Sequence, residues 1–186
     1  MCTAVGLRCW LDALAECNFQ AHVWFGARCS SWIGMCRRQH GRKAVNGCRG
    51  DRARSFVRVG NLQMVVTSLA MAIGHWSGAN PVLEQPITSV MPRAEPLRSV
   101  LRSINASKHV VWHGASSGES PKPLQIWSSK DLSALQRGRP LFRRFKKLCQ
   151  SNGKSYSGNR KALKRSQTYT HEFGRAVAGV VKPWLK

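Results

Sequence analysis

A short serine motif is the clearest hint of catalysis in this sequence. The segment GASSG, Gly114–Gly118, fits the G-x-S-x-G pattern that exposes a nucleophilic serine between a strand and a helix. Asp131 and His171 follow in the chain order that a hydrolase triad requires. A helix must begin directly after Ser116, however, and two nearby prolines oppose one. A serine hydrolase therefore remains a secondary hypothesis, which labelling with a fluorophosphonate probe would test.

A second group of residues has the side chains of a metal site. Thiol and imidazole ligands that zinc accepts fall within twenty residues, at Cys29, Cys36, His40 and Cys48. The intervening stretches of six, three and seven residues lack the close cysteine pair that forms the usual zinc turn. We interpret Cys29 and Cys36 as small apolar core residues and expect no metal and no other cofactor.

Carboxylates are scarce. The chain has eight Asp and Glu among 186 residues, and they are spread thinly. Paired carboxylates for acid–base catalysis, or a carboxylate cage for a hard cation, are therefore not expected. This scarcity, together with the weak serine motif, predicts a protein that is not an enzyme.

Positive charge dominates the composition. Thirty Lys and Arg against eight acids give a formal net charge of +22, and residues 137–186 contain fourteen basic residues but only one acid, Glu172. Such a surplus repels itself in a compact state and attracts polyanions. The expected partners are RNA, DNA or an anionic membrane surface.

Two basic clusters carry this expectation most directly. Arg143–Lys147 and Arg160–Arg165 are separated by twelve residues, a spacing typical of a bipartite nuclear localisation signal. Arginine forks bind phosphate in a bidentate way, and interleaved aromatic rings can stack on unpaired bases. The predicted nucleic-acid-binding residues are Arg143, Arg144, Lys146, Lys147, Arg160, Lys161, Lys164, Arg165, Phe145 and Tyr156, with Arg37, Arg38, Arg42 and Lys43 as a second contact.

We therefore predict a small, non-enzymatic, basic protein that binds RNA or DNA phosphates, with RNA as the favoured partner. Its expected location is intracellular, and nuclear or nucleolar in a eukaryotic or virus-infected eukaryotic cell. The alternative is an orphan or overlapping-frame accessory protein that acts by protein or membrane contact, or has no selected activity. The basis of this alternative is that the chain is rich in Arg, Ser, Gly, Trp and Cys but has only two Tyr.

The elements that would position these residues are short. Leu7, Trp10, Leu11 and Leu14 share one face of a helix that the pattern extends to about Phe25. Ser55–Val59 alternates like a strand. Leu62–Ile73 is the most apolar segment, and its twelve residues fall short of the roughly 20 that span a bilayer. It predicts a buried helix, with an interfacial membrane segment as the alternative.

The remaining chain is punctuated by proline and basic runs. We expect a helix over Leu97–Ile104, a strand over His109–His113, a helical patch over Asp131–Gln136 and a basic amphipathic helix over Leu141–Cys149. The predicted fold is mainly α with short strands, irregular, and disordered in the C-terminal third and the Pro-rich middle. The predicted regions are an apolar Cys- and Trp-containing segment with a basic stretch (1–76), a Pro-rich linker (77–96), a small mixed segment (97–136) and a basic tail (137–186).

Overall fold

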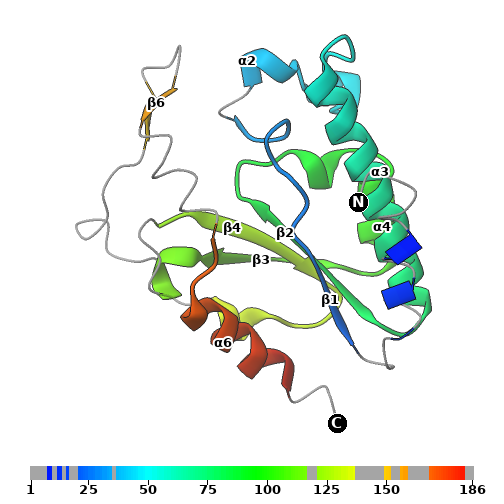
Figure 1. Ribbon diagram of the computed structural model, residues 1–186, viewed down its shortest axis with the longest axis vertical. Coiled ribbons are helices and arrows are strands. Elements are labelled where there is room, and N and C mark those ends of the chain that lie inside the picture. Colours follow the sequence, from blue (N-terminus) through cyan, green and yellow to red (C-terminus); the bar gives the residue numbers. More distant parts are fainter. Residues whose placement is uncertain are drawn as a thin grey trace. The chain divides into compact units, whose positions relative to one another are not determined.

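A four-stranded mixed sheet is the centre of the fold, in a computed structural model that describes residues 8–9, 12–13, 16, 21–34, 37–116, 121–136, 149–151, 156–158 and 168–182. The sheet has the strand order β1-β2-β4-β3, and three helices of seven residues or more, α3, α4 and α6, accompany it (Figure 1). The prediction of a mainly α, irregular fold is therefore wrong. The chain divides into two units, residues 1–108 with 126–131 and residues 109–125 with 132–186.

The elements follow one another in a simple order. The first unit begins with β1 (His22–Phe25), α2 (Arg37–His40), η2 (Ala44–Asn46), α3 (Ser55–Trp76), β2 (Asn80–Pro86), η3 (Met91–Arg93) and α4 (Leu97–Ser103). The strands β3 (Ser107–Trp112) and β4 (Pro123–Ser128) come next. The second unit also contains η4 (His113–Ser116), η5 (Ser133–Leu135), the pair β5 (Cys149–Ser151) and β6 (Tyr156–Gly158), and α6 (His171–Val181).

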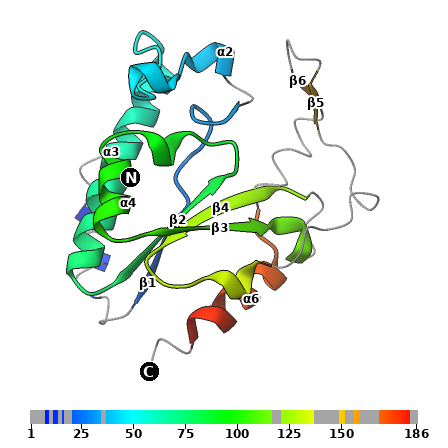
Figure 2. The same cartoon turned by 180° about the vertical axis from the view of Figure 1, so that it is seen from behind.

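The first unit is built around a β-α-β arrangement. Strands β1 and β2 pair in parallel, in a register that runs from His22 opposite Asn80 to Phe25 opposite Leu83. Parallel neighbours need a long crossover, and here it contains the loop 26–54 and α3. Helix α3 packs against both β2 and α4, and the view from behind also shows α3 and α4 side by side (Figure 2).

The Pro-rich middle is ordered, so the prediction of disorder there is wrong. Residues 80–85 of β2 are all buried. Its two prolines, Pro81 and Pro86, occupy the second and last positions of the strand, close to its ends, where a missing amide donor disturbs the ladder least. Burial of the Val82–Leu83 stretch therefore outweighs the turn signal that four prolines in seventeen residues suggest.

Two further sequence-based predictions are also wrong. Residues His22–Phe25 form strand β1 and not the end of a helix, because they pair with β2. Ser55–Val59 forms the first turn of α3 and not a strand, because α3 continues without interruption to Trp76. The helix over Leu97–Ile104 and the strand over His109–His113 are confirmed, within one or two residues, by α4 and β3.

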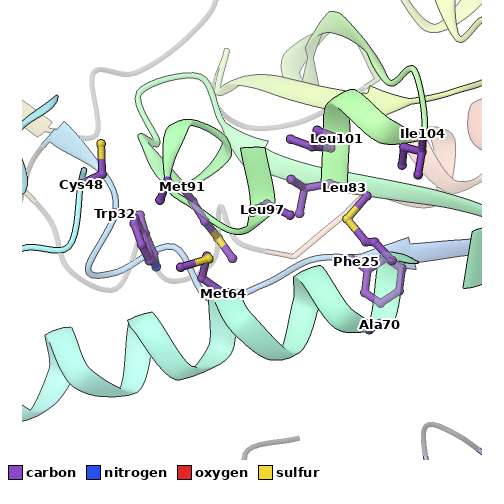
Figure 3. Close-up of a cluster of buried hydrophobic side chains, with 12 residues drawn as sticks. Phe25, Trp32, Cys48, Met64, Ala70, Leu83, Met91, Leu97, Leu101 and Ile104 are labelled. Atoms are coloured by element: carbon purple, nitrogen blue, oxygen red, sulfur yellow. The ribbon is translucent and has the colours of Figure 1, made fainter. Parts of the chain in front are cut away.

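A buried apolar cluster holds the first unit together. Trp32, Met64 and Met91 meet at one end of it, where α3 faces the loop before α4 (Figure 3). Each fully buried side chain of this size contributes about 1.5–3 kcal/mol relative to an exposed one. The full cluster is Phe25, Trp32, Cys48, Met64, Ala70, Met71, Leu83, Met91, Ala94, Leu97, Leu101 and Ile104.

The second unit has a smaller aromatic cluster beside α6. The ring of His113 lies 5.9 Å from that of Tyr169 and 5.7 Å from that of Phe173, centre to centre. Thr170 caps α6: its Oγ1 accepts a hydrogen bond from the Phe173 amide at 3.1 Å and donates one to the Ser116 carbonyl. These contacts fix the start of α6 against η4.

Candidate nucleic-acid interface

Arg42, one of the predicted phosphate-binding residues, is buried in the first unit. Only 4% of it is exposed, and its guanidinium carbon lies 3.4 Å from the centre of the Trp32 ring. Its Nε donates to the Ser31 carbonyl at 2.6 Å, and its Nη1 donates to the Cys48 carbonyl at 2.6 Å and to Asn61 Oδ1 at 2.7 Å. Arg42 therefore joins three segments that are distant in sequence.

No described carboxylate forms an ion pair with Arg42, so carbonyl dipoles and the Trp32 ring stabilise its charge. Burial lowers its pKa to about 10, and the guanidinium stays charged at neutral pH. Since its donors point into the protein, Arg42 is a structural residue, and our proposed interface does not include it.

Two glycines allow the chain to pass this close to Arg42. A Cβ at Gly60 in α3 would collide with Ser31 Oγ. Gly50 has φ of +71°, and a Cβ there would lie 2.5 Å from the His40 carbonyl oxygen. The loop is thereby held against α3, and the residue after Arg42, Lys43, is exposed at the surface.

Among the candidate zinc ligands that the structure describes, Cys29, His40 and Cys48 do not assemble into a site. The His40 ring uses both nitrogens: Nδ1 accepts from the Arg42 amide at 2.9 Å, and Nε2 lies 3.1 Å from the Ile33 carbonyl oxygen. Cys48 is buried in the apolar cluster, and Cys36 is outside the described residues. Among the residues that the structure describes, no three His, Cys, Asp or Glu are placed to hold a metal ion.

The serine motif does not have the geometry of a nucleophile elbow. Ser116 is buried at the end of the 3-10 helix η4, whereas a nucleophile elbow exposes its serine directly after a strand. The following residues 117–120 lie outside the described part. His171 is the exposed first residue of α6. We therefore assign no catalytic role to these residues.

Two adjoining surface depressions in the first unit gather basic side chains. The first is lined by Lys43, Arg93 and Arg98 among others, and the second by Arg93, Arg98 and Arg102. Glu95 is the single acid that lines either of them. Because Arg93 and Arg98 line both depressions, the four cations form one continuous surface, which we call the arginine groove.

One of these cations is partly neutralised. Arg98 Nε lies 2.6 Å from Glu95 Oε1, and both side chains are nearly half exposed. Hydrogen bonds from Ser99 and then Arg98 hold the pKa of Glu95 below its usual range, so this carboxylate stays ionised. Lys43, Arg93 and Arg102 make no ion pair with any described residue and leave the groove positive.

An aromatic ring accompanies the cations. Trp127, on β4, is partly buried against the apolar cluster and lines the second depression together with Arg102 and Asn105. Its position beside arginines is the arrangement with which proteins bind unpaired bases, by stacking and phosphate contact together. The groove therefore combines several cations with a partly buried aromatic ring.

A second group of arginines surrounds the start of α3. Arg54 Nε contacts Asp51 Oδ2 at 3.0 Å, and the hydrogen bond from Arg54 lowers the pKa of Asp51. Arg58 Nη1 donates to the carbonyls of Arg52 and Ala53, at 3.2 and 3.0 Å. These arginines are exposed, and residues 51–53 of the preceding loop accept their hydrogen bonds.

Most of the predicted binding residues lie outside the described part of the chain. These are Arg143, Arg144, Phe145, Lys146, Lys147, Arg160, Lys161, Lys164 and Arg165. Tyr156 is in β6, and Arg37 and Arg38 are in α2. Of the predicted residues that the structure describes, Arg42 and Lys43 line the first depression, and Lys43 is the one that is exposed there.

Sequence reasoning missed the other members of the groove, Arg93, Arg98, Arg102 and Trp127. One signal was present: Arg98 and Arg102 are four residues apart within the predicted helix 97–104, so they share a helix face. Nothing in the sequence brings Trp127 to that face, because β4 joins the sheet beside β2 only in the folded chain.

In comparisons with known proteins, no protein-family model matches this chain, no curated protein is detectably similar to it, and no solved structure matches its fold.

Proposed function

We propose that the protein binds single-stranded nucleic acid, RNA in preference to DNA, and that it acts by binding and not by catalysis. The observation that carries this proposal is the arginine groove, in which Lys43, Arg93, Arg98 and Arg102 converge on two adjoining depressions beside Trp127. Phosphates would lie along the cations, and one or two bases would stack on the indole.

The chemistry of this surface predicts how binding depends on salt. Neutralising a phosphate releases condensed counterions, and for single strands the logarithm of the affinity falls by about 0.7 per phosphate for each tenfold rise in salt. With three or four cations in contact, the groove alone would give a slope of about −2 to −3. The basic clusters 143–147 and 160–165, which we propose as a second contact, would steepen it.

The proposal includes the cellular location expected from the sequence. Clusters 143–147 and 160–165 have the spacing of a bipartite nuclear import signal, which favours a nuclear or nucleolar location in a eukaryotic host. Fusing residues 137–186 to a fluorescent protein tests this part separately, because import needs only the two clusters.

Fluorescence anisotropy with a labelled twelve-nucleotide oligo-uridylate tests the groove. The double variant Arg93→Gln, Arg102→Gln removes two cations that make no ion pair with a described residue. We expect about tenfold weaker binding at 0.15 M salt and a salt slope reduced by about 1.4.

A matched control removes two exposed cations of the same unit that do not line the groove, Arg28→Gln with Lys130→Gln. Both double variants have the same net charge, so a general charge effect would weaken them equally. Equal weakening would contradict a site at the groove, and selective weakening of the Arg93, Arg102 variant supports it.

A further inference from the structure

Helix α3 has two apolar faces, and the described residues of the first unit fully bury only one of them. The inner face carries Val57, Met64 and Met71, spaced seven residues apart and all buried. Gly60 and Gly74 are buried as well, and Gly60 lets α3 approach Ser31 closely. This face accounts for the packing of α3 on β2 and α4.

The outer face is equally apolar and largely exposed. Leu62 is 48% exposed, Leu69 51% and Trp76 79%, and Val59 is 44% exposed one turn before them. The full outer face is Val59, Leu62, Val66, Leu69, Ile73 and Trp76, of which Val66 and Ile73 are partly buried, and Val65, 45% exposed, lies beside it. No Lys, Arg, Asp or Glu occurs between Val59 and Trp76, so no charge interrupts this stripe.

The spacing on the outer face is that of a coiled-coil seam. Its six residues follow one another at intervals of three, four, three, four and three. The first position of each heptad is β-branched, at Val59, Val66 and Ile73, whereas the fourth is Leu62, then Leu69. β-branched residues at the first position with leucine at the fourth favour two parallel strands over other coiled-coil states.

We propose that the outer face of α3 is a self-association surface, on which the α3 helix of a second copy packs in parallel to form a symmetric dimer. A second copy presents the same heptad pattern over the same length, so each seam residue meets its own counterpart. Arg58 precedes the seam residue Val59, and Gln63 follows the seam residue Leu62. In a parallel pair these two flanking positions face each other across the seam, so Arg58 faces Gln63 of the second helix and not another cation.

The inner face argues against a membrane as the occupant. By length and hydropathy, α3 is the one helix among the described residues that is long and apolar enough to cross a bilayer. Crossing would, however, take Met64 and Met71 out of the apolar cluster that they share with Trp32 and Leu83. A dimer uses only the outer face and leaves the cluster intact.

The size and charge of the surface set the strength of the dimer. The seam extends over about 26 Å, at 1.5 Å per residue, which is short for a coiled coil. The helix is already formed by its packing on the first unit, so pairing costs little ordering of the chain. Exposed arginines at the start of α3, at Arg52 and Arg54, would lie near one another in a parallel pair. We therefore expect a micromolar dimer that strengthens with salt, opposite to nucleic-acid binding.

Sedimentation velocity of the reduced full chain, at 1–200 µM and at 0.15 and 0.5 M salt, tests the proposal. The variant Leu62→Lys, Leu69→Lys places two charges on exposed seam positions and should raise the dimer dissociation constant at least 100-fold without unfolding the protein. Val45→Lys, at a 90% exposed residue away from α3, is the control and should dimerise like the natural chain. A natural chain that stays monomeric at 200 µM in 0.5 M salt would overturn the proposal.

A photo-crosslinker at Leu69 identifies the occupant. In an equal mixture of ¹⁴N- and ¹⁵N-labelled protein, the proposal predicts mixed-isotope products that join two α3 helices near Leu69. Products of a single isotope that reach residues 1–20 would show that the chain's own N-terminal segment covers the face. Labelled lipid, with vesicles of neutral phosphatidylcholine present, would show a membrane occupant. Either of these results would overturn the dimer.

Discussion

The guanidinium carbon of Arg42 lies 3.4 Å from the centre of the Trp32 ring, inside the first unit. Trp32 is fully buried, and its indole Nε1 has no hydrogen-bond partner among the described residues. The ring face is therefore what Trp32 offers Arg42, while carbonyl oxygens around the guanidinium satisfy its donors. This pair fixes the loop that ends at the start of α3 and presents Lys43 to the groove.

Replacing Arg42 with Lys should destabilise the first unit although the charge is kept. Lysine has three donors on one atom and cannot reach Ser31, Cys48 and Asn61 together, so buried carbonyls lose their partners. Each lost bond to a charged group costs about 1.5–3 kcal/mol. Urea unfolding should show a loss of about 3 kcal/mol, whereas Arg49→Lys, at an exposed neighbour, should lose less than 0.5 kcal/mol. Equal losses would contradict the role of Arg42.

Gly60→Ala should destabilise α3 although alanine is the better helix former. Its methyl group would collide with Ser31 Oγ and crowd Arg42 Nη2, which lies 3.2 Å from the added carbon. Gly174→Ala in α6 is a matched control, because nothing lies within 4 Å of its added carbon, and it should stabilise α6 by about 0.5–1 kcal/mol. Opposite signs in thermal unfolding are expected. A stabilised Gly60→Ala variant would show that α3 does not approach Ser31 so closely.

The cluster beside α6 should loosen in mild acid. Burial, and then the charge of Lys122, lowers the pKa of His113 from its ordinary 6.5. Between the lowered pKa and 6.5 the unfolded chain binds more protons than the folded one, so the stability is complete above about pH 6.5 and falls as the pH drops below it. Amide exchange in α6 should therefore be faster at pH 5.5 than at pH 7.5, after correction for intrinsic rates.

The variant His113→Phe separates this effect from other titrations. Phenylalanine keeps a ring against Tyr169 and Phe173 but does not titrate, so the α6 amides should lose most of their extra opening in acid. Burial also lowers the pKa of His22, which belongs to the first unit. The acid response of the amides near His22 should therefore be the same in the natural chain and in the His113→Phe variant. An unchanged acid response in α6 would assign it to a group other than His113.

The parts of the fold that could be predicted from sequence are those set by local pattern. Helix α4 and strand β3 follow from periodicity and β-branched content, because neither needs a distant partner to be recognised. Strand β2 could not be predicted, since its prolines indicate a linker locally, and only its position between β1 and β4 makes it a central strand. The same holds for β1, which the helical pattern of the preceding residues obscured.

The candidate site shows the same division. In a basic stretch Arg42 looks like any exposed cation, and its burial depends on Ser31 and Asn61, which lie eleven and nineteen residues away. The arginine groove forms because the fold brings Arg93 and Lys43 to the same depression, and no local sequence motif predicts that proximity. The outer face of α3 is different: its heptad spacing is present in the sequence, but only the structure shows that this face is left exposed.

An NMR titration of ¹⁵N-labelled, reduced protein with a short single-stranded RNA at physiological salt is the decisive test of binding at the arginine groove. We expect saturable shifts of the Trp127 indole N–H and of the amides around Arg93 and Arg102, with smaller changes at Arg28 and Lys130. Uniform broadening that heparin reproduces equally well, with no preference for the groove, would contradict it.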